Sequence, residues 1–326
     1  MRIVFLGSPA FALPSLEALL ASGHEVVAVV SQPDRPAGRG HRPTPPPAKL
    51  LAQARGIAVI QAENVSEPGR VEQLRALAPD VFVVAAFGQI LRQRLLDVPR
   101  RGCLNVHASL LPRHRGAAPI AAAILAGDEA TGVTVMEVVR ALDAGPVVAQ
   151  LREPISPFDT TGTLEERLAR AGGRLLGETL DDWYAGRLQP TPQDDSIVTY
   201  APQIRRADAR IDWSRPAVEL WRRVRAYNPW PVAFTTLRQA QGAAWRGEEL
   251  RVLEAWPLQG DSGSEPGTVL APERLPEDAG DEEAFSVQTG DGRLAVRKLQ
   301  RPGRRVLSGL EFLRGERGLV GQRFGD

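Results

Sequence analysis

The sequence has very little cysteine, which limits the chemistry its sites can perform. Cys103 is the only cysteine among 326 residues, so the chain can form no disulfide within itself and no cysteine-based zinc site. A chain so poor in cysteine fits a reducing compartment, and we expect the protein to be cytoplasmic. Long hydrophobic runs are also lacking: no uncharged apolar stretch of membrane-spanning length occurs, and we expect residues 2–7 to form a strand rather than part of a signal peptide.

An excess of charge of either sign is lacking as well. The formal net charge is +1, so no overall field indicates a nucleic-acid-binding protein, and any basic surface must be local. Hydrophobic residues make up 43% of the chain and charged residues 24%, which is typical of soluble globular proteins. The length of 326 residues suggests about two domains.

Short apolar strands alternate with helices in the first half of the chain. Strands are predicted at residues 2–7, 24–31, 57–61, 81–88, 102–109 and 131–139, and helices at 14–23, 48–56, 71–80, 119–128 and 163–186. This order predicts an α/β fold with a Rossmann-like parallel sheet, in which ligands bind beyond the carboxyl ends of the strands. The first strand lacks the G-x-G-x-x-G pattern, which disfavours an NAD-dependent oxidoreductase.

The second half of the chain has a different sequence pattern. Residues 188–207 are polar and contain proline, and we interpret them as a linker between a domain at 1–187 and a domain at 208–326. One helix at 217–228 is followed by short strand-like runs that Gly-rich and Pro-rich turns separate. This pattern predicts a small β-barrel of the oligonucleotide-binding (OB) type.

Two polar residues follow each other at alternate positions in the strand predicted at 102–109. Side chains at i and i+2 of a strand face the same side, so Asn105 and His107 should point together toward the strand's end. An amide that donates hydrogen bonds beside an imidazole suits a reaction in which a carbonyl oxygen gains charge while a proton moves. The alternative is an Asn–His pair that caps a turn.

A carboxylate follows the strand predicted at 131–139. Asp143 should lie in a turn at the same edge of the sheet, where it could orient His107, raise the pKa of His107, or take a proton itself. The alternative is a simple Asx turn. His114 is seven residues from His107, a spacing that fits no usual metal site, and we expect it to be a surface residue.

Longer motifs surround these residues. NVHASLLPRHRGAAPI followed by ALDAG resembles the signature of folate-dependent formyltransferases. QPDRPAGRG, VFVVAAFGQIL, VTYAPQI, ARIDWS and VRAYNPWP extend the resemblance over essentially the whole chain, to the members of that family that act on methionyl-tRNA. The resemblance implies a Rossmann-like formyltransferase domain followed by an OB-like barrel.

The resemblance also implies an activity, which is transfer of the formyl group of 10-formyltetrahydrofolate to the α-amino group of methionine on initiator methionyl-tRNA. No metal, membrane or obligate protein partner is implied, and we expect a monomer. Asn105, His107 and Asp143 would surround the formyl group. The residues that the resemblance places around the folate are Ala86, Phe87, Gly88, Gln89, Ile90, Leu91, Ser109, Leu110, Leu111, Pro112, Val139, Arg140, Ala141 and Leu142.

Two basic segments are candidates for tRNA contact. The resemblance places the loop QPDRPAGRG near the acceptor stem, with Arg39 as the strongest candidate and Arg35 and Arg42 in support; the alternative is a solvated basic loop. A second segment, residues 294–305, contains no acidic residue and suits a nucleic-acid backbone, or else forms an exposed charged hairpin. Its basic residues are Arg297, Lys298, Arg301, Arg304 and Arg305.

Two other functions remain open. A sugar N-formyltransferase would keep the chemistry and act on a nucleotide-linked amino sugar, but the basic segments argue against it. A tRNA-binding protein without catalytic activity would keep the second domain, but the complete set of Asn105, His107 and Asp143 argues against that function.

Overall fold

The computed structural model describes residues 1–37, 42–237, 248–280, 282–316 and 318–325. The chain forms two compact units. The first unit comprises Met1–Ala123, Glu129–Ile155 and Thr163–Gln203, and the second comprises Ile124–Asp128, Ser156–Gly162 and Ile204–Asp326. The division near residue 203 falls inside the segment interpreted as a linker, residues 188–207, most of which is part of the first unit.

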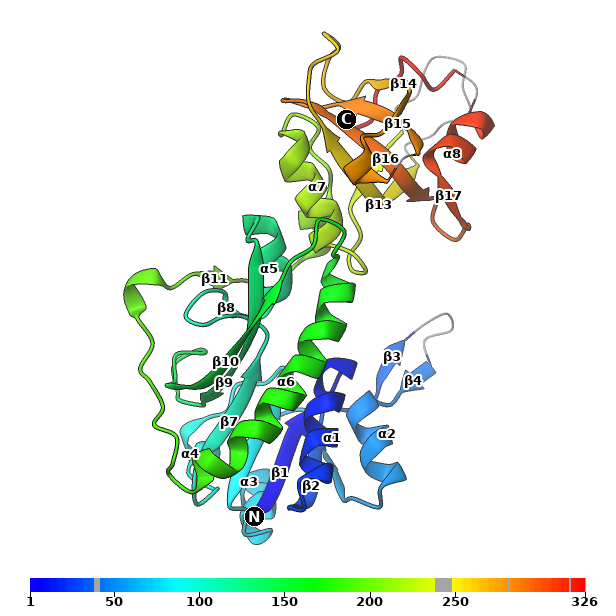
Figure 1. Cartoon of the computed structure of the whole chain (residues 1–326). Coiled ribbons are helices and arrows are strands. Elements are labelled where there is room, and N and C mark those ends of the chain that lie inside the picture. The colour runs from blue at the N-terminus through cyan, green and yellow to red at the C-terminus, as the bar shows by residue number, and fades with distance from the viewer. Residues whose placement is uncertain (38–41, 238–247, 281, 317, 326) are drawn as a thin grey trace. The chain divides into compact units, whose positions relative to one another are not determined.

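A seven-stranded sheet forms the centre of the first unit, in the order β10-β9-β7-β6-β1-β2-β5 (Figure 1). Five neighbouring strands are parallel, which confirms the Rossmann-like prediction; they are β1 (Arg2–Gly7), β2 (Glu25–Ser31), β5 (Val59–Gln61), β6 (Val81–Ala85) and β7 (Cys103–His107). The last two strands depart from the parallel arrangement. β9 (Ala130–Glu137) runs antiparallel to β7, and β10 (Val147–Pro154) runs antiparallel to β9.

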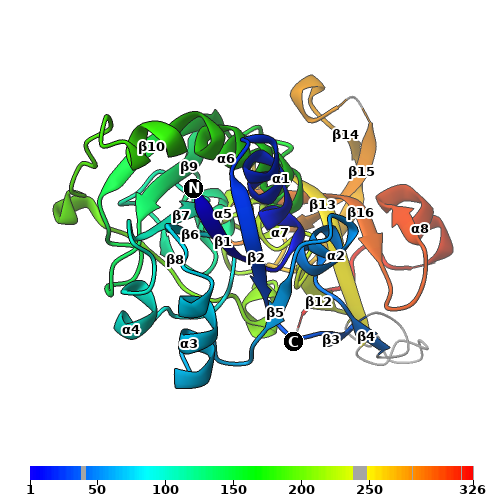
Figure 2. The ribbon, with the colours of Figure 1, turned by 90° about the horizontal axis from the view of Figure 1, so that it is seen from below.

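Helices cover both faces of this sheet (Figures 1 and 2). α1 (Leu13–Ala21) and α6 (Thr161–Tyr184) lie on one face, and α3 (Pro68–Ala76) and α4 (Gln93–Leu96) lie on the other. A Cβ on Gly172 of α6 would lie 2.6 Å from Val106, so α6 packs directly on β7. The remaining helices are α2 (Pro47–Ala54) and α5 (Pro119–Ala126). Strands β1 and β6 are almost wholly buried, as expected for strands covered on both faces.

Two short strand pairs in the first unit were not predicted. β3 (Arg35–Ala37) and β4 (Arg42–Thr44) form an antiparallel pair at the base of the loop QPDRPAGRG. β8 (Arg115–Gly116) pairs in parallel with β11 (Tyr200–Ala201), so residues 200–201 lie beside the segment that follows His107.

An antiparallel sheet forms the second unit, which confirms the prediction made from the change of sequence pattern. Its order is β12-β13-β16-β15-β14, with β17 also paired to β16. Helices α7 (Ala217–Ala226) and α8 (Gly309–Gly315) pack against it. The strands are β12 (Phe234–Thr236), β13 (Glu249–Leu258), β14 (Val269–Arg274), β15 (Glu283–Gln288), β16 (Arg293–Gln300) and β17 (Val306–Ser308).

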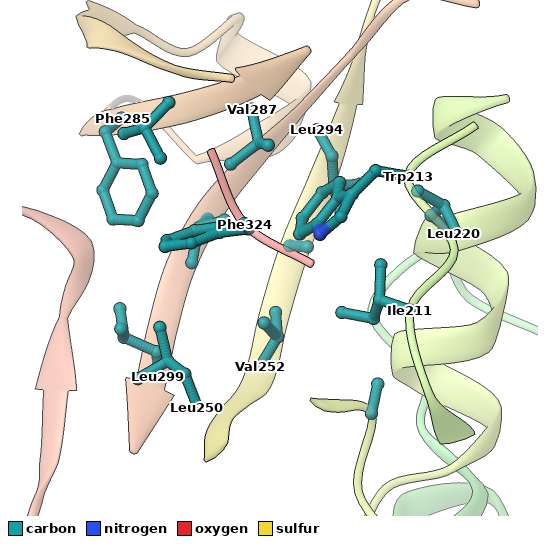
Figure 3. Close-up of a cluster of buried hydrophobic side chains, with 14 of the residues drawn as sticks. Ile211, Trp213, Leu220, Leu250, Val252, Phe285, Val287, Leu294, Leu299 and Phe324 are labelled. Carbon is teal, nitrogen blue, oxygen red and sulfur yellow. The ribbon is translucent and has the colours of Figure 1, made fainter. Parts of the chain in front are cut away.

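The C-terminal segment connects the two edges of this sheet. Phe324 forms a bridge with Leu237, directly after β12, and Arg323 forms a bridge with Thr268, directly before β14. The Phe324 side chain enters the core beside Trp213, with ring centroids 5.9 Å apart (Figure 3). Within the described residues β12 and β14 do not pair with each other, so a closed OB-like barrel stays a prediction. In the part of the chain that the structure describes, no helix could cross a membrane.

Candidate functional site

Strand β7 places Asn105 and His107 on one face of the sheet, as predicted. Val106 contacts α6 on one side, whereas Cys103 packs in the core beneath α3 and α4 on the other. Because side chains alternate along a strand, Asn105 and His107 share the Cys103 face. Cys103 itself is buried, and burial raises the pKa of its thiol to about 12, so it is not a nucleophile.

The imidazole of His107 is buried and is held by a hydrogen bond at Nε2. Its Nε2 lies 3.1 Å from the carbonyl oxygen of His114. A carbonyl only accepts, so Nε2 carries the proton, and in the neutral ring Nδ1 keeps its lone pair. Nδ1 lies 3.8 Å from Asp143 Oδ2. Burial lowers the pKa of His107, although the Asp143 carboxylate and the His114 carbonyl act in the opposite direction.

His114 does not lie on the surface, so that prediction was wrong. The residue is 6% exposed and has a positive φ of 59°. Its backbone N–H donates to Thr199 Oγ1 over 2.8 Å, while its carbonyl accepts from His107. His114 therefore fixes the tautomer of His107 through its backbone carbonyl.

Asp143 reaches His107 by a route that differs from the predicted one. Because β9 is antiparallel to β7, its last residue, Glu137, pairs with Leu104, far along β7 from His107. The connection between β9 and β10 then runs back and brings Asp143 to the imidazole, so Asp143 lies at the predicted edge although β9 does not end there. Asp143 has a positive φ of 46°, and its Oδ2 accepts the N–H of Gly116 over 2.9 Å.

A second set of contacts, which the sequence did not indicate, supports the Asp143 turn. Gln193 Nε2 donates to the carbonyl oxygens of Asp143 and Gly145, over 2.8 Å in each case. Arg115 Nε and Nη2 donate to Gln193 Oε1 over 3.0 and 2.8 Å. Arg115 also pairs with Asp195 over 2.9 Å. Arg115 belongs to the motif NVHASLLPRHRGAAPI, but no spacing rule relates it to Gln193, 78 positions away.

Gly116 offers a direct test of this local structure. Its φ is 126°, and a Cβ there would lie 2.5 Å from the carbonyl oxygen of Ala201. We expect Gly116→Ala to lower the free energy of unfolding by roughly 1–3 kcal/mol, because it combines an unfavourable φ with a clash against backbone. Chemical denaturation measures this change. Gly69→Ala, in α3 with no atom within 4 Å of its Cβ, is the control, and an equal effect of both substitutions would contradict the account.

The loops predicted to hold the folate expose apolar side chains. The loop 86–91 follows β6, with Ala86 at φ 46° and Gly88 at φ 76°. Phe87 and Leu91 are buried in the core, whereas Ile90 is 80% exposed. Val139 and Leu142, in the connection after β9, are 40% and 58% exposed. Arg140 and Ala141 of this connection are exposed too.

The turn at residues 109–112 is held by its own polar groups. Ser109 Oγ donates to the carbonyl oxygen of Arg113 over 2.6 Å. The N–H of Leu111 donates to Thr134 Oγ1 over 3.2 Å, and Gln150 donates to the Leu111 carbonyl over 2.8 Å. These hydrogen bonds therefore fix the conformation of the turn that follows His107. Leu110 and Pro112 are partly buried in it.

The predicted tRNA residues of the first unit are only partly described. Arg39 and the side chain of Arg42 lie outside the described residues. Arg35 is exposed and pairs with Glu63 over 2.7 Å. Below this hairpin, Lys49 binds Asp34 over 2.8 Å, and this contact lowers the pKa of Asp34.

The basic segment 294–305 is less positive in the structure than in the sequence. Acidic residues from other parts of the chain pair with most of its basic side chains, while Arg304 is exposed. The pairs are Arg297 with Glu282, Lys298 with Glu254 (2.7 Å), Arg301 with Glu248 (3.3 Å) and Glu316 (2.6 Å), and Arg305 with Glu311 (3.2 Å). The local basic field inferred from sequence is therefore largely compensated.

No cluster of three or more potential metal-ligating side chains occurs among the residues that the structure describes.

Two family models match the chain: formyl transferase over residues 1–180, and the formyl transferase C-terminal domain over residues 203–317. The chain belongs to the formyl transferase family. This finding confirms the family resemblance of the sequence motifs.

Relatives within the formyl transferase family match the whole chain. The protein named methionyl-tRNA formyltransferase in Methylococcus capsulatus is 46% identical over 100% of both chains. Those of the same name in Chloroflexus aurantiacus and Bacillus subtilis are 45% and 44% identical, over 97% and 96% of this chain and 97% and 94% of theirs.

Solved structures support the fold. A sugar 3N-formyl transferase, WlaRD, matches with a TM-score of 0.64 at 16% identity, over 94% of this chain and 99% of its own. HypX from Aquifex aeolicus, in complex with tetrahydrofolic acid, matches with a TM-score of 0.62 at 20% identity, over 96% of this chain and 47% of its own. These likenesses confirm the formyltransferase fold.

Proposed function

We propose that this formyltransferase moves the formyl group of 10-formyltetrahydrofolate to the α-amino group of methionine on initiator methionyl-tRNA. The product, formylmethionyl-tRNA, serves translation initiation, and we propose that the protein acts in the cytoplasm as a monomer. Full-length relatives at 44–46% identity that bear this name support the acceptor. The contact of His107 Nδ1 with Asp143 Oδ2, at 3.8 Å, carries the proposal of catalysis.

The residues present fit a folate donor. Exposed apolar side chains at Ile90, Val139 and Leu142 offer a surface for a flat ring, and the loop residues Ala86 and Gly88 turn at positive φ. When bound, the donor supplies a formyl group on a nitrogen atom. The loops at 86–91 and 139–142 would hold the donor's ring beside Asn105 and His107.

Asn105 and His107 would divide the chemistry between them. The side-chain amide of Asn105 is half-buried and has no hydrogen-bond partner among the described residues, so its N–H is available to the oxygen that gains negative charge. His107 Nδ1 accepts the proton that the amine loses as its nitrogen bonds to the formyl carbon. As the old carbon–nitrogen bond breaks, Nδ1–H returns that proton to the departing nitrogen, so the protons balance.

Asp143 would stabilise the protonated form of His107. Its carboxylate lies on the Nδ1 side, where the proton arrives, and it raises the pKa of His107 against the effect of burial. The 3.8 Å separation exceeds hydrogen-bond length, so the carboxylate acts through charge while leaving Nδ1 accessible.

The pH dependence of turnover tests the state of His107. Burial lowers its pKa below the ordinary value of 6.5, and only the neutral ring can accept a proton. We therefore expect kcat to stay level as pH falls through 6.5 and to decline with a midpoint below that value. An acid limb with a midpoint above 6.5 would contradict the assignment of His107 as a neutral base.

For the acceptor, we propose that the basic residues of both units contact tRNA. Arg39, in the segment QPDRPAGRG, together with Arg35 and Arg42, would reach the acceptor stem. In the second unit, Arg297, Lys298, Arg301, Arg304 and Arg305 are the candidates. Arg304 is exposed, whereas the other four side chains would exchange carboxylate partners for phosphate.

A panel of acceptors tests the proposed function. Purified protein is incubated with the formyl donor and with charged initiator tRNA, charged elongator tRNA or a nucleotide-linked amino sugar. The amino sugar is the second candidate acceptor because the fold is similar to that of a sugar formyl transferase. We expect formyl transfer to the charged initiator tRNA. Product on the sugar alone would keep the active site and overturn the tRNA acceptor. Bound tRNA without product on any acceptor would favour a binding protein.

A further inference from the structure

We propose that Gln193 is a positioning residue that holds Asp143 at its working distance from His107. This inference rests on the proposed role of Asp143. Gln193 belongs to the segment after α6, outside the motifs that carry the family resemblance, and it contacts none of the reacting atoms. It acts on the backbone of Asp143.

The Gln193 amide binds the Asp143 turn through two hydrogen bonds. Its Nε2 donates to the carbonyl oxygens of Asp143 and of Gly145, each over 2.8 Å. These two bonds use both protons of the amide nitrogen. Asp143 has a φ of 46°, a conformation that a residue other than glycine keeps only where its surroundings hold it. The two hydrogen bonds from Gln193 are among those constraints.

The orientation of the amide is fixed from the other side. Arg115 donates from Nε and Nη2 to Gln193 Oε1 over 3.0 and 2.8 Å. A guanidinium can only donate and a carbonyl can only accept, so a reversed amide would lose all four bonds. The Arg115 side chain is 6% exposed and is itself held by Asp195 over 2.9 Å.

The same strand holds the carboxylate end of Asp143. Gly116 follows Arg115 in β8, and its N–H donates to Asp143 Oδ2 over 2.9 Å. β8 thus positions the carboxylate directly through Gly116 and the backbone indirectly through Arg115 and Gln193. The distance from Oδ2 to His107 Nδ1 depends on both connections.

Two substitutions of Gln193 separate the effect of its hydrogen bonds from the effect of its size. Gln193→Leu keeps the size and removes every hydrogen bond. Gln193→Glu keeps the acceptor for Arg115 but sets carboxylate oxygen against the two carbonyl oxygens. We expect each to lower kcat about 10- to 100-fold, the effect of a small misplacement of a reacting group, with KM for both substrates nearly unchanged. Gln189→Leu, which removes a single 3.3 Å bond to the Gly186 carbonyl, is the matched control and should leave kcat unchanged.

A double-mutant cycle tells positioning of Asp143 from a general structural role. With Asp143→Asn already present, Gln193→Leu should lower the single-turnover rate little further, because the charge it positions is gone. An equal loss of rate in both backgrounds, or an unchanged kcat in Gln193→Leu, would overturn the inference. Thermal unfolding checks each variant, and if Gln193→Leu does not fold, Gln193→Glu takes its place in the cycle.

The assay uses whichever acceptor the acceptor panel shows to be formylated. If Asp143→Asn alone turns over like the wild type, the proposed role of Asp143 fails and the inference fails with it. If Asp143→Asn is impaired while Gln193→Leu and Gln193→Glu are fully active, the inference alone fails.

Discussion

Replacing His107 with alanine is expected to lower kcat by about a thousandfold, within the 10²–10⁴-fold that general acid–base groups contribute. The imidazole of His107 presents a nitrogen lone pair at Nδ1, because its Nε2–H donates to the His114 carbonyl. Single-turnover formyl transfer at saturating substrates measures the loss. Circular dichroism confirms that the variant is folded.

His24→Ala is the control for this substitution. His24 pairs with Asp181 over 2.7 Å and precedes β2, so it lies at the edge of the sheet opposite the carboxyl ends of the parallel strands. Its removal should leave kcat unchanged, since a surface ion pair contributes little. Wild-type turnover in folded His107→Ala would sink the assignment of His107.

The second large effect is expected from Asp143→Asn, with kcat reduced about 10²- to 10³-fold, as when a positioned charge is lost from a developing ion pair. Asparagine keeps the shape and an oxygen for the Gly116 N–H, so the turn should survive. The substitution removes the carboxylate that raises the pKa of His107. The acid limb of the pH profile should therefore move to still lower pH while kcat falls.

Asp181→Asn, the surface partner of His24, is the matched control for Asp143→Asn and should change neither kcat nor the pH profile. An Asp143→Asn variant with reduced kcat but an acid limb moved to higher pH would contradict the account. In that case the carboxylate would not support the charged form of His107.

Local patterns in the sequence predicted much of this structure. Alternating strands and helices identified the five parallel strands, and the i, i+2 spacing placed Asn105 and His107 on one face. The short β-rich runs after residue 232 matched strands β12 to β16. Each of these features depends on residues close together in the chain, where periodicity is informative.

Features set by contacts between distant residues could not be predicted. The antiparallel direction of β9 depends on how its flanking connections pack, and a strand's apolar pattern is the same in either direction. The pairing of Arg115 with Tyr200 in β8 and β11, and the contact of Gln193 with the Asp143 turn, join segments that carry no shared period. His114 has the polar character of a surface residue, yet it is buried and its carbonyl accepts from His107.

Charge is subject to the same limitation. Residues 294–305 contain no acid, yet carboxylates from as far away as Glu248 and Glu254 pair with Arg301 and Lys298. A count of charges along a segment therefore overstated its field. The pairing partners become known only when the sheet of the second unit is assembled.

The mechanism depends on a neutral His107 with its proton on Nε2, and the ¹⁵N chemical shifts of its imidazole test this most directly. The chain has four histidines, so comparison of labelled wild-type protein with His107→Ala assigns the two signals of His107. At neutral pH we predict a protonated Nε2 and an unprotonated Nδ1, with titration only below 6.5. A ring protonated on Nδ1, or an imidazolium at neutral pH, would contradict the account, because no lone pair would then face the reacting amine.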